Sequence, residues 1–246
     1  MASSAKRIEP RSLETQARAS LADSVRALTQ VAQHNATAVA AAAEMLIGCF
    51  EDGGTVYFCG NGGSAADAQH LAAEFSGRYL VDRPGLPAVA LTANSSAVTA
   101  IGNDYGYDAV FSRQLEGCGA PGDVLVAITT SGRSESIRRA VRTAQQLGMN
   151  VIGMTGAKGA EFAAMCDVAL VTPSASTPNI QEGHIAMGHA FCLIVERTMF
   201  PDAAAGGGPL PAKRTAVARK PARKIARKSA ARPAGKRKPA SRRTSS

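Results

Sequence analysis

The chain has 246 residues, of which 45% are hydrophobic and 4% aromatic, and it contains no Trp. This length accommodates one large α/β domain or two small ones, and the scarcity of aromatic residues leaves no visible platform for stacking bases or sugars. The net charge of +9 is unevenly distributed: residues 213–246 hold 14 Lys and Arg and no acidic residue, whereas the rest of the chain has 14 basic and 19 acidic residues, a net of −5.

The five cysteines form no CxxC pair, and most lie in apolar segments, where a free thiol behaves as a small hydrophobic side chain. This usage favours a reducing compartment. The N-terminus lacks the apolar stretch of a secretion signal, and the apolar segment 38–50 is too short to span a bilayer and contains Glu44. We therefore expect a cytoplasmic protein with no membrane association.

Residues from about Ser12 to Glu51 show helical periodicity, and we predict two helices that break near His34-Asn35. Beyond them, strands are predicted at Thr55–Cys59, Ala88–Leu91, Val124–Ile128, Val151–Met154 and Val168–Val171. The helices predicted between these strands include Ser64–Arg78, Ser134–Leu147 and Gly159–Met165. Short, almost continuous apolar strands that alternate with helices indicate an α/β fold with a parallel sheet covered on both faces.

A last helix is predicted from Thr177-Pro178 to about Met199, because Thr is a good N-cap and Pro is preferred at the first helical position. Phe200-Pro201 should end it, and 203–209 should form a flexible linker. The following Lys, Arg, Ala and Pro bury too little surface to offset ordering entropy, so we expect a disordered tail. The expected boundaries are a disordered N-terminus at 1–11, one domain at 12–201, and a linker with basic tail at 202–246.

Two reactive side chains, His70 and Glu74, follow a glycine-rich turn at Gly60–Ser64. A spacing of four residues places them on one face of a helix, where an imidazole and a carboxylate could hold a transition metal or move a proton. The turn follows a buried strand, and its backbone N–H groups suit a phosphate. The alternative for the pair is a solvated helix face with an incidental ion pair.

A second candidate for phosphate binding is Thr129–Ser134, where several hydroxyl groups and a Gly follow one strand and precede a helix. Alone, it could equally be a capping cluster. Two such turns at the carboxyl ends of strands favour a ligand site, because ligands collect there in open α/β folds. A third cluster, Gly102–Gly106, could be a tight turn, which Gly, Asn and Asp favour.

The last predicted helix contains Gln181, His184 and His189. A lone His on a mostly apolar helix is more often a core residue than a ligand. Gln181 and His189 are eight residues apart, about 12 Å along a straight helix. One metal binds both only if Gln181 reaches back, the helix start is irregular, or another subunit contributes. His184 lies off that face.

These motifs together closely resemble the phosphoheptose isomerases, from about Ser20 to Met199. The resemblance is carried by Cys59–His70 (CGNGGSAADAQH), Glu74, Gly77–Tyr79 (GRY), Arg83–Ala88 (RPGLPA), Gly102–Gly106 (GNDYG), Thr130–Ser134 (TSGRS) and Ile180–His184 (IQEGH). It implies a sugar isomerase (SIS) domain, a three-layer sandwich with a five-stranded parallel sheet after the N-terminal helical pair, and a homotetramer. It also implies interconversion of sedoheptulose 7-phosphate and D-glycero-D-manno-heptose 7-phosphate, which starts the heptose supply for lipopolysaccharide.

The resemblance further implies roles for individual residues. Those that fall at the family's positions for a divalent metal, usually zinc, are His70, Glu74, Gln181 and His189, and the proton-transfer positions are Glu74 and His189. Those implied to bind the sugar phosphate are Asn61, Gly62, Gly63, Ser64, Glu74, Asn103, Asp104, Thr129, Thr130, Ser131, Ser134 and Gln181. The chemistry is consistent, because an enediol route needs a proton carrier and stabilisation of developing negative charge.

An alternative is a non-catalytic relative, the DnaA initiator-associating protein, which this chain resembles at Met199-Phe200-Pro201. That protein lacks the carboxylate and imidazole present here as Glu74 and His189, which favours the enzyme. Two departures, Asn179 for the usual Arg and Arg133 for a common Asn, bear on substrate preference. The tail at 213–246 resembles linker-histone-like bacterial proteins and would either bind nucleic acid without sequence specificity or only solubilise the chain.

Overall fold

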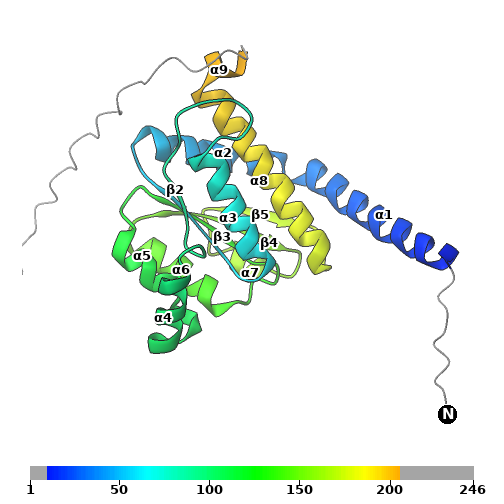
Figure 1. Cartoon of the computed structure of the whole chain (residues 1–246), viewed down its shortest axis with the longest axis horizontal. Coiled ribbons are helices and arrows are strands. Elements are labelled where there is room, and N and C mark those ends of the chain that lie inside the picture. The colour runs from blue at the N-terminus through cyan, green and yellow to red at the C-terminus, as the bar shows by residue number, and fades with distance from the viewer. Residues whose placement is uncertain (1–9, 206–246) are drawn as a thin grey trace, which may run out of the picture. The chain divides into compact units, whose positions relative to one another are not determined.

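A parallel sheet of five strands forms the middle layer of the domain, in the order β2-β1-β3-β4-β5 (Figure 1). The computed structural model describes residues 10–205. The strands are β1 (Val56–Gly60), β2 (Ala88–Ala90), β3 (Val124–Ile128), β4 (Asn150–Gly156) and β5 (Val168–Thr172). All five lie where the sequence predicts them, with ends that differ by two residues or fewer, and the α/β class is confirmed.

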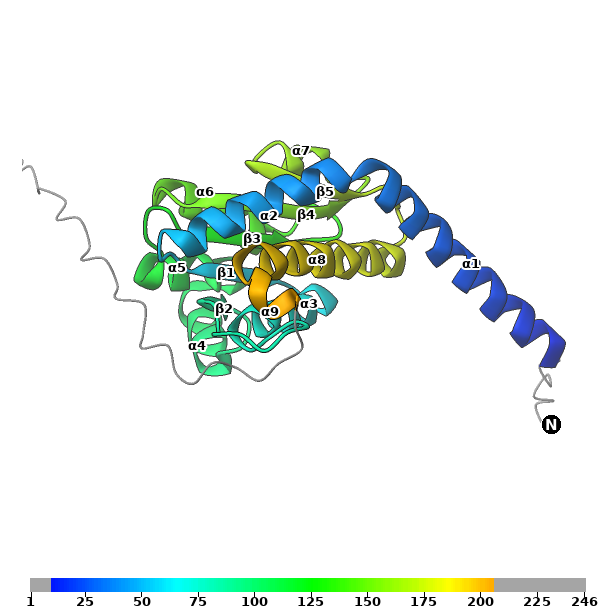
Figure 2. The same ribbon diagram turned by 90° about the horizontal axis from the view of Figure 1, so that it is seen from above.

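Helices cover both faces of this sheet (Figure 2). One face is covered by α2 (Ala36–Glu51), α3 (Gly63–Ser76) and α8 (Thr177–Met199), and the other by α5 (Ser112–Cys118), α6 (Glu135–Gln146) and α7 (Ala160–Ala163). The remaining helices are α1 (Pro10–His34), α4 (Ser95–Tyr105), α9 (Pro201–Ala205) and a 3₁₀ turn at Tyr107–Ala109. No helix among residues 10–205 is long and apolar enough to cross a membrane.

The strands read as continuous apolar runs because successive side chains enter different cores. In β3, Val124, Val126 and Ile128 belong to the core under α2, α3 and α8, whereas Leu125 and Ala127 belong to the core under α5 and α6. A strand side chain alternates between the two faces, so a strand covered on both faces must be apolar at every position.

The predicted break between the first two helices is confirmed at Asn35. This side chain is buried, and it donates to the Val171 carbonyl at 3.0 Å while accepting from the Val171 N–H at 3.1 Å. Because β5 is an edge strand, this pair of bonds satisfies backbone groups that the sheet leaves unpaired. Before the break, α1 leaves the side chains of Leu21 and Val25 67% and 63% exposed.

Several predicted boundaries were wrong. Residues 102–105, for which a tight turn was one alternative, form the last turn of α4, which ends at Gly106 with φ of 83°. The helix predicted at Gly159–Met165 is only Ala160–Ala163. The last helix has the predicted bounds, Thr177–Met199, but its N-cap is Ser176 and not Thr177.

At both ends of the domain the helices extend further than predicted. Helix α1 begins at Pro10, inside the expected disordered N-terminus, and α9 continues to Ala205, inside the expected linker. Both start at Pro, which is preorganised for a first helical position. The basic tail lies outside the described residues.

Candidate active site

The topology places a switch point where β1 and β3 end. These strands are neighbours, but the chain continues from β1 to β2 on one side and from β3 to β4 on the other. Such a switch point is where open α/β sheets bind ligands. The turns Gly60–Ser64 and Thr129–Ser134 follow the two strands, so both predicted phosphate turns lie at this switch point.

The first turn is held by hydrogen bonds to Asn61. Its amide nitrogen donates to Ser136 Oγ at 2.9 Å, and its amide oxygen accepts from the Tyr107 hydroxyl at 2.9 Å. Gly62 lies in the left-handed region with φ of 57°, which favours a residue without a side chain. Sequence reasoning missed Ser136 and Tyr107, which orient Asn61 from α6 and from the 3₁₀ turn.

The third cluster, Gly102–Gly106, directly precedes Tyr107, whose hydroxyl donates to Asn61 in the first turn. Asn103 and Asp104 themselves are exposed, and the Asn103 amide donates to the Asp104 carboxylate at 2.8 Å. Within residues 10–205, neither side chain has a hydrogen bond to either phosphate turn, so their substrate contacts stay a prediction.

A polar pocket of about 120 Å³ lies at the second turn. It is lined by Thr130, Ser131, Arg133, Lys158, Ser174, Ala175, Thr177 and Ile180. Helices α6 and α8 both begin beside it, and Ser134, at the N-cap of α6, makes no side-chain capping bond. Two helix N-termini and several hydroxyl groups therefore face a space that suits an anion.

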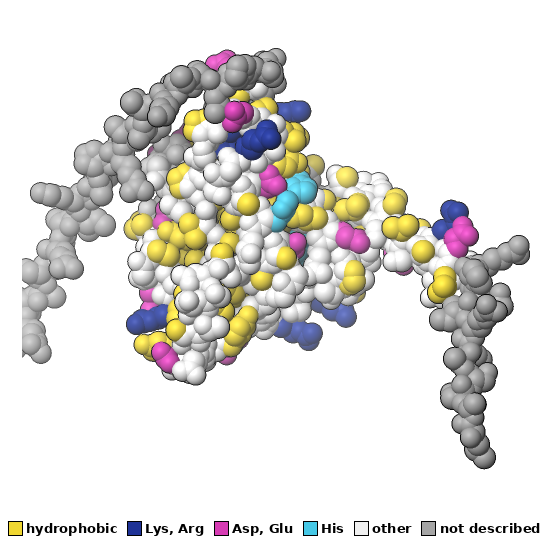
Figure 3. All heavy atoms as spheres, in the orientation of Figure 1, with side chains coloured by type: hydrophobic (Ala, Val, Ile, Leu, Met, Phe, Trp, Pro, Cys, Tyr) yellow, Lys and Arg dark blue, Asp and Glu magenta, His cyan; other side chains and the backbone are white. Residues whose placement is uncertain are grey.

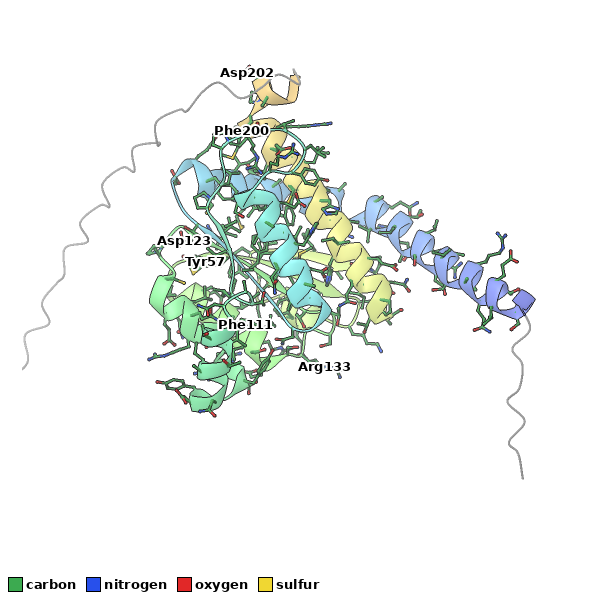
Figure 4. All side chains as sticks on the ribbon, viewed as in Figure 1. Tyr57, Phe111, Asp123, Arg133, Phe200 and Asp202 are labelled. Carbon is green, nitrogen blue, oxygen red and sulfur yellow. The ribbon has the colours of Figure 1, made fainter. Side chains whose placement is uncertain are left out.

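Two loops build the basic wall of this pocket. Gly132 has φ of 67°, and a Cβ atom there would lie 2.8 Å from Gly159 Cα, so only Gly lets the loops approach this closely. This contact brings Lys158, on the loop after β4, to the pocket that Arg133 lines. Figure 4 shows Arg133 at the end of the domain where α3 and α8 begin.

The pocket cations lack acidic neighbours. No Asp or Glu lines the pocket, and within residues 10–205 neither Arg133 nor Lys158 forms an ion pair. By contrast, nearby Arg138 is paired with Glu161 at 3.0 Å. Sequence reasoning missed Lys158, because it belongs to no motif.

A second cluster, between α3 and α8, contains His70, Glu74 and His189. Their donor atoms lie within 4.8 Å of one another, with 3.3 Å from His70 Nε2 to Glu74 Oε1 and 2.8 Å from His70 Nε2 to His189 Nε2. Ligands of tetrahedral zinc with bonds of 2.0–2.1 Å are about 3.3 Å apart. The donor types and the His70–Glu74 distance therefore fit a zinc ion, and the two imidazoles lie about 0.5 Å closer together than such ligands.

Close helix packing brings His189 to this cluster. A Cβ atom at Gly188 would lie 2.6 Å from Leu71 Cδ2, so the absence of a side chain there lets α8 approach α3. Burial and the neighbouring His70 lower the pKa of His189, and Glu74 partly opposes this. A neutral imidazole is the form that binds a metal. His side chains reach the surface on this face of the molecule, beside an acidic side chain (Figure 3).

Gln181 is not part of this cluster. Its side chain lies against Gly63, at the start of α3, and it is eight residues from His189, about 12 Å along α8. His184 is fully buried, neither ring nitrogen has a hydrogen-bond partner in the described part of the chain, and burial lowers its pKa to about 4. The structure thus brings three of the four predicted metal ligands together and places His184 in the core.

Known proteins resemble this chain in sequence. The SIS domain family matches residues 21–156. The phosphoheptose isomerase of Rhodospirillum rubrum is 55% identical over 161 residues, which cover 65% of this chain and 86% of that protein. The phosphoheptose isomerase of Burkholderia pseudomallei is 53% identical over 158 residues, which cover 64% of this chain and 80% of that protein.

Solved structures of phosphoheptose isomerases also resemble this chain in fold. The phosphoheptose isomerase of Neisseria gonorrhoeae has a TM-score of 0.71 at 45% identity and covers 75% of this chain and 98% of its own. That of Francisella tularensis has a TM-score of 0.73 at 38% identity and covers 76% and 98%. The similarity therefore spans nearly the whole of each solved chain.

Proposed function

We propose that this chain, which belongs to the SIS-domain family and within it to the phosphoheptose isomerases, interconverts sedoheptulose 7-phosphate and D-glycero-D-manno-heptose 7-phosphate. The observation that carries the proposal is the pairing of an anion pocket at the ends of the strands with the cluster His70, Glu74 and His189. We further propose the cytoplasm as its location and heptose supply for lipopolysaccharide as its role.

The reaction moves a proton between adjacent carbons and another between their oxygens. In our proposal the Glu74 carboxylate takes and returns the carbon-bound proton, and His189 serves the oxygens. A zinc ion held by His70, Glu74 and His189 would stabilise the negative charge that develops on those oxygens. The turns Gly60–Ser64 and Thr129–Ser134 would bind the phosphate, whose binding energy positions the reacting carbons.

The direct test is an assay of the purified full chain with sedoheptulose 7-phosphate, before and after a chelator. We expect turnover that the chelator abolishes and Zn²⁺ restores. Turnover that survives complete metal removal would contradict the metal role while leaving the isomerase function in place. No turnover with Zn²⁺ present would contradict the function.

Two observations support association with further copies of this chain, which we propose is the homotetramer that the resemblance implies. Helix α1 exposes apolar side chains at Leu21 and Val25, which a second copy would cover. In addition, Gln181 is too far along α8 to join His189, so a Gln181 from a second copy could complete the predicted set of metal ligands.

The alternative of a DnaA-binding scaffold gains no support from the comparisons, since the relatives described above are named as isomerases. The residues whose loss would mark the scaffold, Glu74 and His189, are present and clustered.

We predict that the pocket cations set substrate affinity. Replacing both Arg133 and Lys158 with Gln should raise KM for the sugar phosphate about tenfold with little change in kcat. Charge-assisted hydrogen bonds to phosphate contribute about 1.5–3 kcal/mol, and solvent reduces that contribution here because both side chains are exposed. Steady-state kinetics over a range of salt concentrations measure this. Arg139→Gln, an exposed change on α6 outside the pocket, is the matched control. An unchanged KM would show that the cations do not contact substrate.

The tail carries a separate proposal, non-specific binding of duplex DNA. Residues 213–246 hold 14 cations and no acidic residue, whereas the rest of the chain has a net charge of −5 and should repel DNA. Removing 213–246 should therefore abolish DNA binding that weakens steeply with salt, and it should leave isomerase kinetics unchanged. A gel-shift titration at two salt concentrations compares the two forms. Equal binding by both would place the contact on the domain, and binding by neither would leave the tail a solubilising extension.

A further inference from the structure

One ion pair, Arg83 with Glu196, is almost completely enclosed. Their side chains are 1% and 2% exposed, and Arg83 Nε lies 2.9 Å from Glu196 Oε2. Every other ion pair in residues 10–205 has a far more exposed partner. A buried ion pair is weak evidence for stability, because apolar residues of similar volume often serve equally well. What distinguishes this pair is therefore the set of backbone groups that it connects.

Arg83 holds the end of α3. Its Nη2 donates to the carbonyl of Glu74 at 2.7 Å, and its Nη1 donates to the carbonyl of Phe75 at 2.9 Å. The last carbonyl groups of a helix have no donor within the helix, and a cation there also complements the helix dipole. Arg83 thus fixes the backbone of the residue whose carboxylate belongs to the metal-binding cluster.

Glu196 holds the loop after α3 to α8. Its carboxylate accepts from the backbone N–H groups of Tyr79 at 3.0 Å, Leu80 at 2.8 Å and Val81 at 3.1 Å. Burial would raise the pKa of Glu196, but these N–H groups and Arg83 outweigh it and lower the pKa, so the carboxylate is charged near neutral pH. Glu196 is seven residues, about two helical turns, after His189, and therefore lies on the same side of α8.

We propose that Arg83 and Glu196 are positioning residues, which fix the end of α3 against α8 so that Glu74 stays in place against His70 and His189. The proposal rests on the proposed metal cluster and isomerase function. An error of about 1 Å in a reacting group can cost about 100-fold in rate, and partners behind metal ligands are worth about 10–100-fold in affinity or activity.

Arg83 and the phosphate pocket lie at opposite ends of α3 and α8, and this separation predicts which kinetic constant should change. The Arg83 guanidinium lies 5.5 Å from the centre of the Phe200 ring, and Figure 4 shows Phe200 at the end of α8 opposite to Arg133. Because the phosphate pocket lies at the Arg133 end, a disturbance at Arg83 should spare phosphate binding. We therefore expect an effect on kcat and on metal affinity, with KM unchanged.

The test is Arg83→Lys in the full chain. Lys keeps the charge, but one ammonium group cannot reproduce the planar fork that reaches Glu196 and two helix carbonyls together. We expect kcat to fall about 10–100-fold and Zn²⁺ affinity to weaken by a similar factor, with KM within about twofold of wild type. Zn²⁺ affinity, measured on metal-free protein by competition with a chromophoric chelator, does not depend on turnover.

Two control variants separate positioning from stability. Arg113→Lys changes an exposed ion pair on α5 and should alter nothing. Leu115→Ala, fully buried on the opposite face of the sheet, should destabilise by about 2–5 kcal/mol but keep kcat and Zn²⁺ affinity at temperatures where circular dichroism shows it folded. If Arg83→Lys behaves like Leu115→Ala, losing stability alone, the positioning role is overturned.

The other outcomes also discriminate. If Arg83→Lys does not fold, Glu196→Gln provides the test, because it preserves shape and acceptor oxygen while removing charge, and the same change in kcat and Zn²⁺ affinity is expected. Wild-type protein that lacks isomerase activity, combined with weaker Zn²⁺ binding by Arg83→Lys, would contradict the proposed function and leave the positioning role supported. A folded Glu196→Gln variant with wild-type kcat and wild-type Zn²⁺ affinity would overturn the positioning role.

Discussion

Replacing Glu74 with Gln is expected to lower kcat by about 10²–10⁴-fold, the usual contribution of a positioned acid or base. The amide has nearly the shape of the carboxylate but can neither accept the carbon-bound proton nor match a carboxylate as a metal ligand. The fold should persist, because the side chain is partly exposed and its close partner in the described part of the chain is His70. Steady-state kinetics and thermal unfolding measure the two effects.

The matched control is Glu44→Gln, the same chemical change at an exposed position on α2. It should leave both turnover and unfolding temperature unchanged. Near wild-type turnover of Glu74→Gln would remove Glu74 from the mechanism, and a large fall in its unfolding temperature would make lost turnover uninformative about proton transfer.

The local part of this architecture could be predicted because it follows from short-range periodicity. A strand that is covered on both faces buries every side chain, so it is apolar at every position. The strands β1 and β3 can therefore be recognised in the sequence. The four-residue spacing of His70 and Glu74 places them on one helix face, and in the structure their side chains meet at 3.3 Å. The break between the first two helices also lies where it was predicted, at Asn35.

The long-range part could not be predicted without the family resemblance. His189 lies 119 residues from His70, and their meeting depends on a close approach of α3 and α8 that Gly188 permits. Arg83 and Glu196 are separated by 113 residues, and nothing in their local sequence marks them as partners. Such contacts arise from tertiary packing, which sequence periodicity does not encode.

Local composition was also misleading at the third cluster. The run from Gly102 to Tyr105 has the composition of a turn, yet it completes α4, which ends at Gly106. Lys158 was missed for a different reason. It belongs to no motif, and it lines the anion pocket only because the loops that contain Gly132 and Gly159 lie in close contact.

Replacing His189 with Asn is expected to abolish turnover and weaken Zn²⁺ binding by about 100-fold. The four ligands of a structural zinc site together supply about 10–16 kcal/mol, so each contributes about 3 kcal/mol, and a neutral amide is a poor substitute for an imidazole. Competition with a chromophoric chelator measures the affinity, and elemental analysis after dialysis measures the occupancy. His34→Asn, at the exposed end of α1, is the matched control and should bind Zn²⁺ as wild type does.

The double variant His70→Ala/His189→Asn makes the test decisive, because it leaves Glu74 as the one donor of the three-residue cluster. Its Zn²⁺ occupancy should fall to the background that the other side chains of the protein provide. Full occupancy in this variant would show that zinc binds elsewhere and would remove the metal from the cluster. Lost turnover with retained Zn²⁺ in His189→Asn alone would instead assign His189 to proton transfer, with His70 and Glu74 sufficient to hold the ion.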